Sequence, residues 1–185
     1  MKMKTFDNNV YFQDTVDDET TLDLIIEMER LKKEYTQVKL WLHSEGGEGC
    51  CGLRTMDTLI EMQNESFEIT TIAFGEVMSS AVYLLLAGKK RYMTKNSFVL
   101  IHQASLENLP QMYHNDLKNY VNFLDRSKII DFNIFCSEYA RVPKKVMKKL
   151  LSSDNNYLEP DKCIKWGIVH GVYHGSINDR KCSVM

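Results

Sequence analysis

The chain alternates between two hydrophobic periods over its first hundred residues. Short runs rich in β-branched and aromatic residues are typical of strands, and apolar residues three and four positions apart are typical of amphipathic helices. The strand-like runs lie at 10–16, 38–44, 69–75 and 91–103. The helical runs lie at about 20–34, 53–62 and 78–88. Strands that alternate with helices in this way predict an α/β fold with right-handed crossovers.

The second half of the chain has mainly helical patterns. From Tyr113 to Glu138, apolar residues are spread along a polar segment without helix breakers, which predicts one long helix. Shorter helices are expected after Pro143 and at about 161–166, with the apolar segment 167–173 completing the core. Because the chain has 185 residues and no repeats or low-complexity linkers, we expect a single domain over 1–185.

Composition and charge narrow the function classes. A formal net charge of −2 argues against nucleic-acid binding, which needs concentrated positive charge. No apolar stretch reaches the length of a membrane span, so no membrane insertion is expected. The five cysteines form neither a C-x-x-C pair nor a Cys/His zinc pattern, so we expect a reducing cytoplasmic location and no metal. The final residues CSVM fit a prenylation pattern, although such short matches arise easily by chance.

Candidate chemistry gathers at the ends of three predicted strands. SEGG (44–47) and FGEVMSS (74–80) each lead from a strand into a helix, and VLIHQ (99–103) ends in a histidine. Parallel neighbouring strands would bring these ends together, where open α/β sheets bind ligands. A catalytic serine needs a nearby imidazole and N–H donors for the oxyanion. On spacing alone, this hypothesis competes with a serine that caps a helix and a histidine that is purely structural.

The same segments resemble the proteolytic subunit of the Clp protease. LHSEGGEGCCGLRTMDTL, FGEVMSSAVYLLLAG, NSFVLIHQ and YLEPDKCIKWGIVHG follow that family's strings in order, within a similarity that runs from about Val10 to His174. The resemblance implies a ClpP and crotonase-like α/β fold, a spiral of β-β-α units. It also implies that the long helix at about 113–138 protrudes as a handle between rings.

Site residues follow from the resemblance position by position. Ser79 matches the nucleophile and His102 the general base, while the backbone N–H groups of Gly47 and Ser80 match the oxyanion hole. The Ser80 hydroxyl itself is expected to be a spectator or a local cap. Where the family has the aspartate that orients the imidazole, this chain has Asn155, with Asp154 immediately before it, so both remain candidates. No metal or organic cofactor is implied.

The resemblance implies a serine endopeptidase of an ATP-dependent Clp-type protease, hydrolysing peptides and unfolded proteins inside a ring chamber. The implied partners are further copies in heptamer-like rings, single or stacked, and an AAA+ unfoldase of the Clp type. Most of the family's amino-terminal axial segment and its glycine-rich strand after His102 are expected to be missing. One alternative is therefore a weak or inactive subunit with a structural or regulatory role in a mixed ring. Another is an acyl-CoA enzyme of the crotonase fold, which needs an oxyanion hole but no Ser/His pair.

Overall fold

The computed structural model describes residues 3–63, 66–104, 113–152 and 156–175. Within these residues, an eight-stranded sheet forms the centre of the fold. The sheet order is β1-β2-β3-β4-β5-β8, and β6 pairs with β4 and with β7. The strands are β1 (Lys4–Phe6), β2 (Asn9–Phe12), β3 (Gln37–Ser44), β4 (Glu68–Met78), β5 (Lys90–Met93), β6 (Phe98–Ile101), β7 (Asn156–Leu158) and β8 (Gly171–Val172). The pairings β2–β3, β3–β4, β4–β5, β4–β6 and β5–β8 are parallel. This confirms the predicted α/β class.

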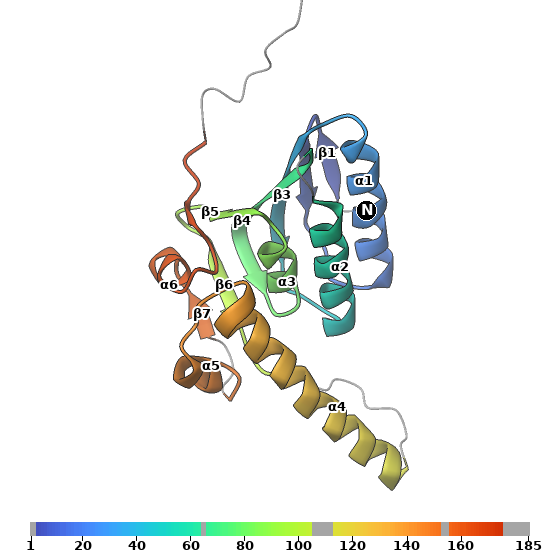
Figure 1. Ribbon diagram of the computed structural model, residues 1–185, viewed down its shortest axis with the longest axis vertical. Coiled ribbons are helices and arrows are strands. Elements are labelled where there is room, and N and C mark those ends of the chain that lie inside the picture. The colour runs from blue at the N-terminus through green and yellow to red at the C-terminus, as the bar shows by residue number, and fades with distance from the viewer. Residues whose placement is uncertain (1–2, 64–65, 105–112, 153–155, 176–185) are drawn as a thin grey trace, which may run out of the picture.

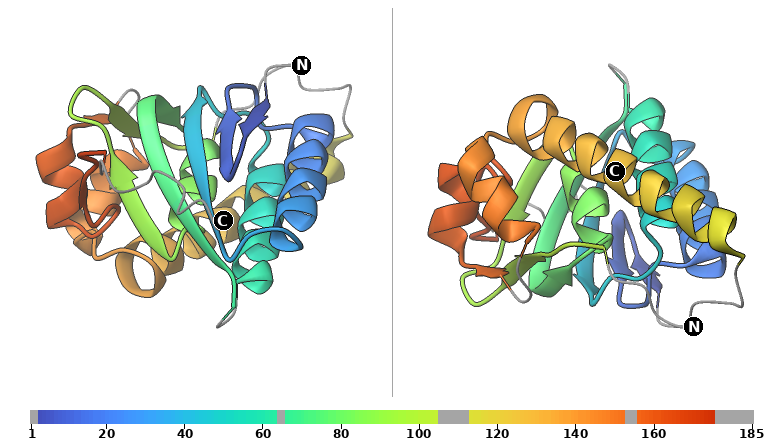
Figure 2. Two further views of the ribbon diagram at one scale, coloured as in Figure 1. Left: turned by 90° about the horizontal axis from the view of Figure 1, so that it is seen from above. Right: turned by 90° about the horizontal axis from the view of Figure 1, so that it is seen from below.

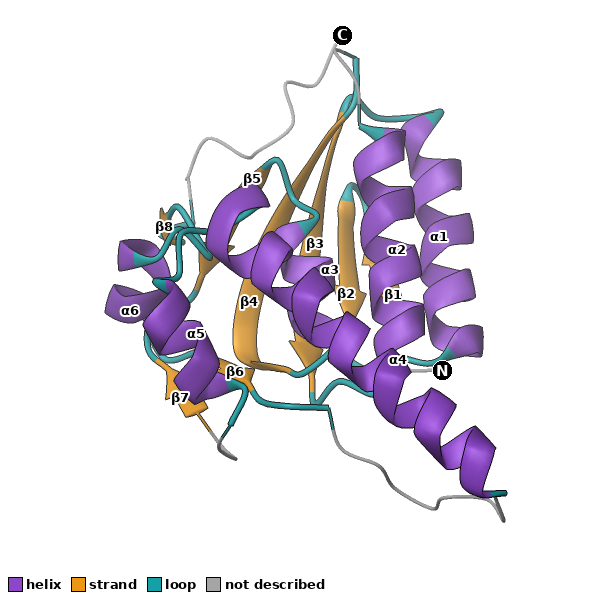
Figure 3. Ribbon diagram, turned by 60° about the horizontal axis from the view of Figure 1, so that its bottom comes forward, coloured by secondary structure: helices purple, strands orange, loops and turns teal. Residues whose placement is uncertain are grey.

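Helices lie at both ends of the row of strands (Figure 2). They are α1 (Asp18–Lys32), α2 (Gly49–Met62), α3 (Ala81–Leu86), α4 (His114–Asn133), α5 (Lys144–Leu150) and α6 (Pro160–Lys165), with a π-helical turn η1 (Ile134–Glu138) directly after α4. Helices α1 and α2 lie side by side, and α4 crosses the sheet and projects beyond the rest of the molecule (Figures 1 and 3). Within the described ranges, no helix combines the length and apolar character needed to cross a membrane.

Several predicted elements have different boundaries in the structure. The run 91–103 is not one strand but two, β5 and β6, because the chain turns between them, where the N–H of Ser97 donates to the Thr94 carbonyl. The strand predicted at 10–16 ends at Phe12, and β1 was not predicted. The long helix is α-helical to Asn133 and continues as the π turn. Its role as a handle between rings stays a prediction.

Strand β4 forks the sheet and thereby positions the site. Its residues 70–73 pair with β5, whereas residues 76–78 pair with β6. The change of partner occurs around Gly75, whose φ of +104° suits glycine because other residues rarely adopt it. The imidazole Nδ1 of His43 accepts the N–H of Glu76 at 3.1 Å and would lie 2.7 Å from a Cβ at Gly75. The bend therefore directs the end of β4 toward β6.

The core fills the space between the sheet and its helices, and α1 contributes one face to it. Leu24 is fully buried, whereas Leu22 on the same helix is 54% exposed. Replacing Leu24 by alanine should lower the free energy of unfolding by about 2–5 kcal/mol, because a buried leucine leaves both lost contacts and a cavity. Leu22→Ala should change it by no more than about 0.5 kcal/mol. Urea titration of both variants measures the difference, and equal effects would contradict this packing.

Candidate active site

Ser79 occupies a strained turn between β4 and α3. Its φ is +53°, a left-handed conformation that costs a non-glycine residue about 1–2 kcal/mol. Two backbone hydrogen bonds hold the turn. The Ser79 N–H donates to the Leu100 carbonyl at 2.9 Å, and the Ser79 carbonyl accepts the Val82 N–H at 3.1 Å. A sharp strand-to-helix turn of this kind presents a serine hydroxyl at the end of a sheet.

The glycine loop after β3 is fastened by a hydroxyl and by a short parallel bridge. Ser44 Oγ donates to the Asp14 carbonyl at 2.5 Å and accepts the Gly46 N–H at 3.1 Å. The Val16 N–H donates to the Gly46 carbonyl at 2.8 Å, and the Val16 carbonyl accepts the Glu48 N–H at 2.7 Å. These contacts hold the backbone of the loop on both sides of Gly47.

The glycine loop lies so close to the serine turn that only glycine fits at position 46. A Cβ at Gly46 would lie 2.6 Å from Ser79 Cβ and 3.2 Å from the Ser80 nitrogen. Within the described residues, neither the Gly47 N–H nor the Ser80 N–H donates a backbone hydrogen bond. Two free amides close to a strained serine are the donor arrangement that an oxyanion requires.

A cavity of about 150 Å³ brings four of the predicted site residues together. Gly47, Ser79, Ser80 and His102 all line it, and His102 directly follows β6. The remaining two candidates, Asp154 and Asn155, lie outside the described residues.

The strand that follows these two candidates lies beside the histidine. Asn156 pairs with Ile101, the residue before His102, in the antiparallel pairing of β6 and β7. The Asn156 amide donates to the Ile101 carbonyl at 3.3 Å and to the Leu150 carbonyl at 3.0 Å. Strand β7, which directly follows Asn155 in the sequence, therefore begins next to the candidate base.

Of the two expected roles of the Ser80 hydroxyl, spectator or local cap, the structure does not show the cap. Ser80 is 3% exposed and stands at the N-cap position, but its side chain makes no capping hydrogen bond. Its Oγ has no hydrogen-bond partner among the described residues. A buried hydroxyl without a partner is unfavourable, which is consistent with a position that is used for its backbone N–H.

A partly buried polar pair, Tyr83 and Asp131, also lines the cavity and was not predicted. The Tyr83 hydroxyl donates a short hydrogen bond to the Asp131 carboxylate. Burial, and then the charge of Asp131, raise the pKa of Tyr83, while burial raises the pKa of Asp131 despite this hydrogen bond. The two residues are 48 positions apart on α3 and α4, so no sequence motif joins them.

Fold and geometry define an α/β protein with a serine, a histidine and the backbone amides of Gly47 and Ser80 around one cavity at the ends of parallel strands. The family model described as Clp protease matches residues 2–176, and the chain belongs to this family. It is similar to the ATP-dependent Clp protease proteolytic subunit of Cyanophora paradoxa, with 35% identity over 98 residues. That match covers 51% of this chain and 49% of the relative, so it spans about half the length of the curated relative. The resemblance read from the sequence is confirmed.

Proposed function

We propose that the chain is a serine peptidase, the proteolytic subunit of a Clp-type assembly. The observation that carries this proposal is the shared cavity, where the strained Ser79 and His102 lie with the N–H groups of Gly47 and Ser80, neither of which donates a backbone hydrogen bond within the described residues. Family membership supports a peptidase independently of this geometry.

The proposed mechanism uses each of these groups at the reacting carbonyl. Ser79 Oγ attacks the peptide carbonyl carbon while His102 takes the hydroxyl proton, and the two amides bind the resulting oxyanion. His102 then protonates the leaving amine as the C–N bond breaks. Water, deprotonated by the same imidazole, hydrolyses the acyl-enzyme and restores the Ser79 hydroxyl.

We propose that Asn155 or Asp154 orients the imidazole, because both residues directly precede β7. The asparagine is the less effective choice, since an Asp-to-Asn change at this position of another serine protease lowered kcat about 10⁴-fold. If Asn155 holds this role alone, turnover is slow. That consequence favours, as a second candidate, a weak or inactive subunit with a structural or regulatory role in a mixed ring.

Self-assembly is proposed from the surface of α4. None of its residues is buried, and five of its large apolar side chains are 42–62% exposed: Leu117, Val121, Phe123, Ile129 and Ile130. Contiguous exposed apolar surface marks an interface in soluble proteins. We propose that further copies cover this helix in heptamer-like rings in the cytoplasm, with an AAA+ unfoldase of the Clp type delivering protein substrates.

Assembly and hydrolysis are tested together on the full chain. Light scattering coupled to size exclusion gives the mass, and quenched peptides together with unfolded casein report cleavage in each fraction. Hydrolysis confined to the assembled fraction supports the proposed peptidase. An assembled chain that cleaves neither substrate, with or without an added unfoldase, favours the inactive subunit.

Asp131 is expected to influence which peptides are cleaved. Asp131 lines the same cavity as Ser79, so a lysine or arginine side chain preceding the cleaved bond gains a charge partner there. Asp131→Asn should lower the ratio of kcat/KM for lysine over norleucine peptides about tenfold, the equivalent of 1.4 kcal/mol. The control Asp125→Asn removes an exposed carboxylate from the same helix and should leave the ratio unchanged. An unchanged ratio in Asp131→Asn would show that the lysine side chain before the cleaved bond does not bind near Asp131.

A further inference from the structure

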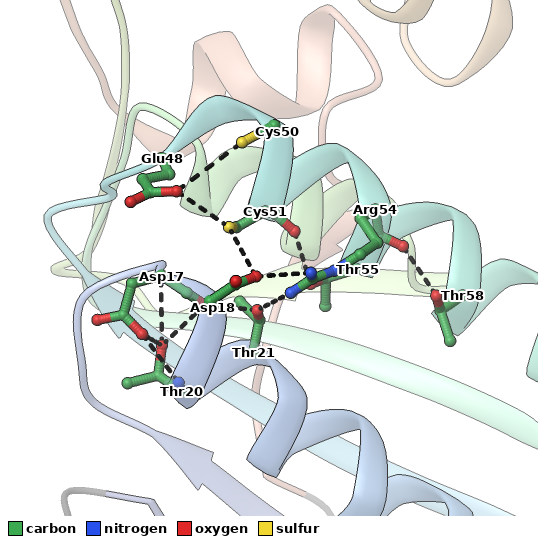
Figure 4. A network of polar contacts seen from close by, with 10 residues as sticks. All are labelled: Asp17, Asp18, Thr20, Thr21, Glu48, Cys50, Cys51, Arg54, Thr55 and Thr58. Atoms are coloured by element: carbon green, nitrogen blue, oxygen red, sulfur yellow. Dashed lines mark hydrogen bonds and ion pairs between the residues drawn. The ribbon is translucent and has the colours of Figure 1, made fainter.

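Two thiols and a carboxylate converge at the start of α2, next to the glycine loop (Figure 4). The Cys50 and Cys51 sulfur atoms and a carboxylate oxygen of Glu48 all lie within 4.8 Å of one another. The Glu48 Oε2 is 3.3 Å from Cys51 Sγ and 3.8 Å from Cys50 Sγ. Cys51 is buried, whereas Cys50 and Glu48 are exposed, so the group is anchored on one side and accessible from solvent on the other.

A second carboxylate reaches the same group from α1. Asp18 Oδ1 lies 3.7 Å from Cys51 Sγ, and it also forms an ion pair with Arg54 at 2.6 Å. Arg54 has a further hydrogen-bond acceptor in the Thr21 hydroxyl at 2.9 Å, so it stays anchored to α1 if Asp18 turns away. Figure 4 shows these side chains meeting between the first turns of the two helices.

Three sulfur–oxygen separations are close to the edge length of a tetrahedral metal site. Zinc binds thiolate sulfur at about 2.3 Å and carboxylate oxygen at about 2.0–2.2 Å, so tetrahedral geometry separates sulfur from oxygen by ~3.5 Å. The sulfur–oxygen distances within this group are 3.3, 3.7 and 3.8 Å. These three edges, out of the six of a four-ligand site, therefore differ from the tetrahedral value by only a few tenths of an ångström.

The electrostatics of the group favour a cation. Within the described contacts of these four side chains, Arg54 is the one positive group, and it contacts only Asp18 of them. A divalent ion would neutralise the remaining negative charge, and each coordinating thiol would release its proton to solvent as the metal–sulfur bond forms.

We propose that Cys50, Cys51 and Glu48 bind a thiophilic divalent ion of the zinc class, with Asp18 or a water as the fourth ligand. Thiolate donors select zinc or cadmium over magnesium and calcium, which prefer oxygen ligands alone. This proposal departs from the expectation of no metal. The sequence shows no zinc pattern because the two cysteines are adjacent and Asp18, a candidate fourth ligand, lies on another helix. It does not depend on the proposed peptidase function.

Cobalt titration of the full, metal-free chain tests the site directly. Co²⁺ should give a near-ultraviolet thiolate charge-transfer band that saturates at one ion per chain and is displaced by Zn²⁺. Cys50→Ser and Cys51→Ser should each weaken cobalt binding by at least about tenfold, and Glu48→Gln should weaken it about tenfold. Cys50 and Glu48 are exposed, so these two variants keep the test valid if Cys51→Ser does not fold.

The matched controls are a thiol and a carboxylate outside the group. Cys136→Ser removes a partly buried free thiol after α4, and Glu61→Gln removes an exposed carboxylate on α2. Neither should change the band or its saturation. The absence of a band, a band that survives Cys50→Ser, or one that is lost in Cys136→Ser would each overturn the proposal. Since the readout is spectroscopic, the result is separate from any outcome of the hydrolysis assays.

Discussion

Ser79→Ala should lower kcat for peptide hydrolysis by about 10⁴-fold or more, to the buffer background, because alanine has no oxygen to attack the carbonyl. Peptide binding should survive, since the cavity and the backbone amides of Gly47 and Ser80 are unchanged. The measurement is steady-state hydrolysis of a quenched peptide at matched protein concentration, together with light scattering to confirm that the assembly is the same as in the parent chain.

Ser80→Ala is the matched control for this loss. It removes the adjacent hydroxyl, which is buried without a partner among the described residues, and it leaves the backbone N–H in place. Activity should stay within a few fold, and the free energy of unfolding should stay equal or rise, because an unsatisfied buried hydroxyl is removed. Loss of hydrolysis in Ser80→Ala with retention in Ser79→Ala would reverse the assignment of the nucleophile.

Gly46→Ala should lower kcat by about 10²–10³-fold, the range seen when one oxyanion donor is lost. The new Cβ would lie 2.6 Å from Ser79 Cβ and 2.7 Å from the Met78 carbonyl oxygen, so the loop and the serine turn must separate. The φ of +94° also places alanine in a strained conformation. Both effects displace Gly47, which directly follows, from the reacting carbonyl.

The control for this substitution is a glycine with room for a side chain. A Cβ at Gly171, in β8, would meet its nearest neighbour at an ordinary 3.9 Å. Gly171→Ala should keep both kcat and the urea midpoint close to those of the parent chain. If Gly46→Ala also keeps them, the close contact between loop and serine turn has no catalytic importance.

Hydrophobic periodicity predicted the elements that surround the site. Strand β3 buries Val38, Leu40 and Leu42 in strict alternation, and this pattern is visible in the sequence. The segment 91–103 was predicted as one strand because its turn contains neither glycine nor proline. Strand β1 has only three residues and no buried side chain, so it leaves no hydrophobic signal.

Four residues of the candidate site could be named from the sequence, but their geometry could not. Ser79, His102, Gly47 and Ser80 were recognised from strand ends and from the family resemblance, and the structure places them around one cavity. The left-handed Ser79 conformation depends on contacts between β4 and β6, which no local pattern specifies.

Two further features of the site also escaped sequence reasoning. The Tyr83–Asp131 pair joins residues that are distant in the chain, and the bend at Gly75 depends on the imidazole of His43 from the neighbouring strand. Such tertiary contacts become visible only when the elements have been packed together.

The most direct test of the central claim is the reaction of the purified chain with a fluorophosphonate, followed by intact mass and peptide mapping. This reagent reports an activated serine without requiring the right peptide or an unfoldase. We expect one adduct per chain, located on Ser79, and its loss in His102→Ala. A folded, assembled chain that forms no adduct, or that carries it on a serine outside the cavity, would contradict the proposed active site.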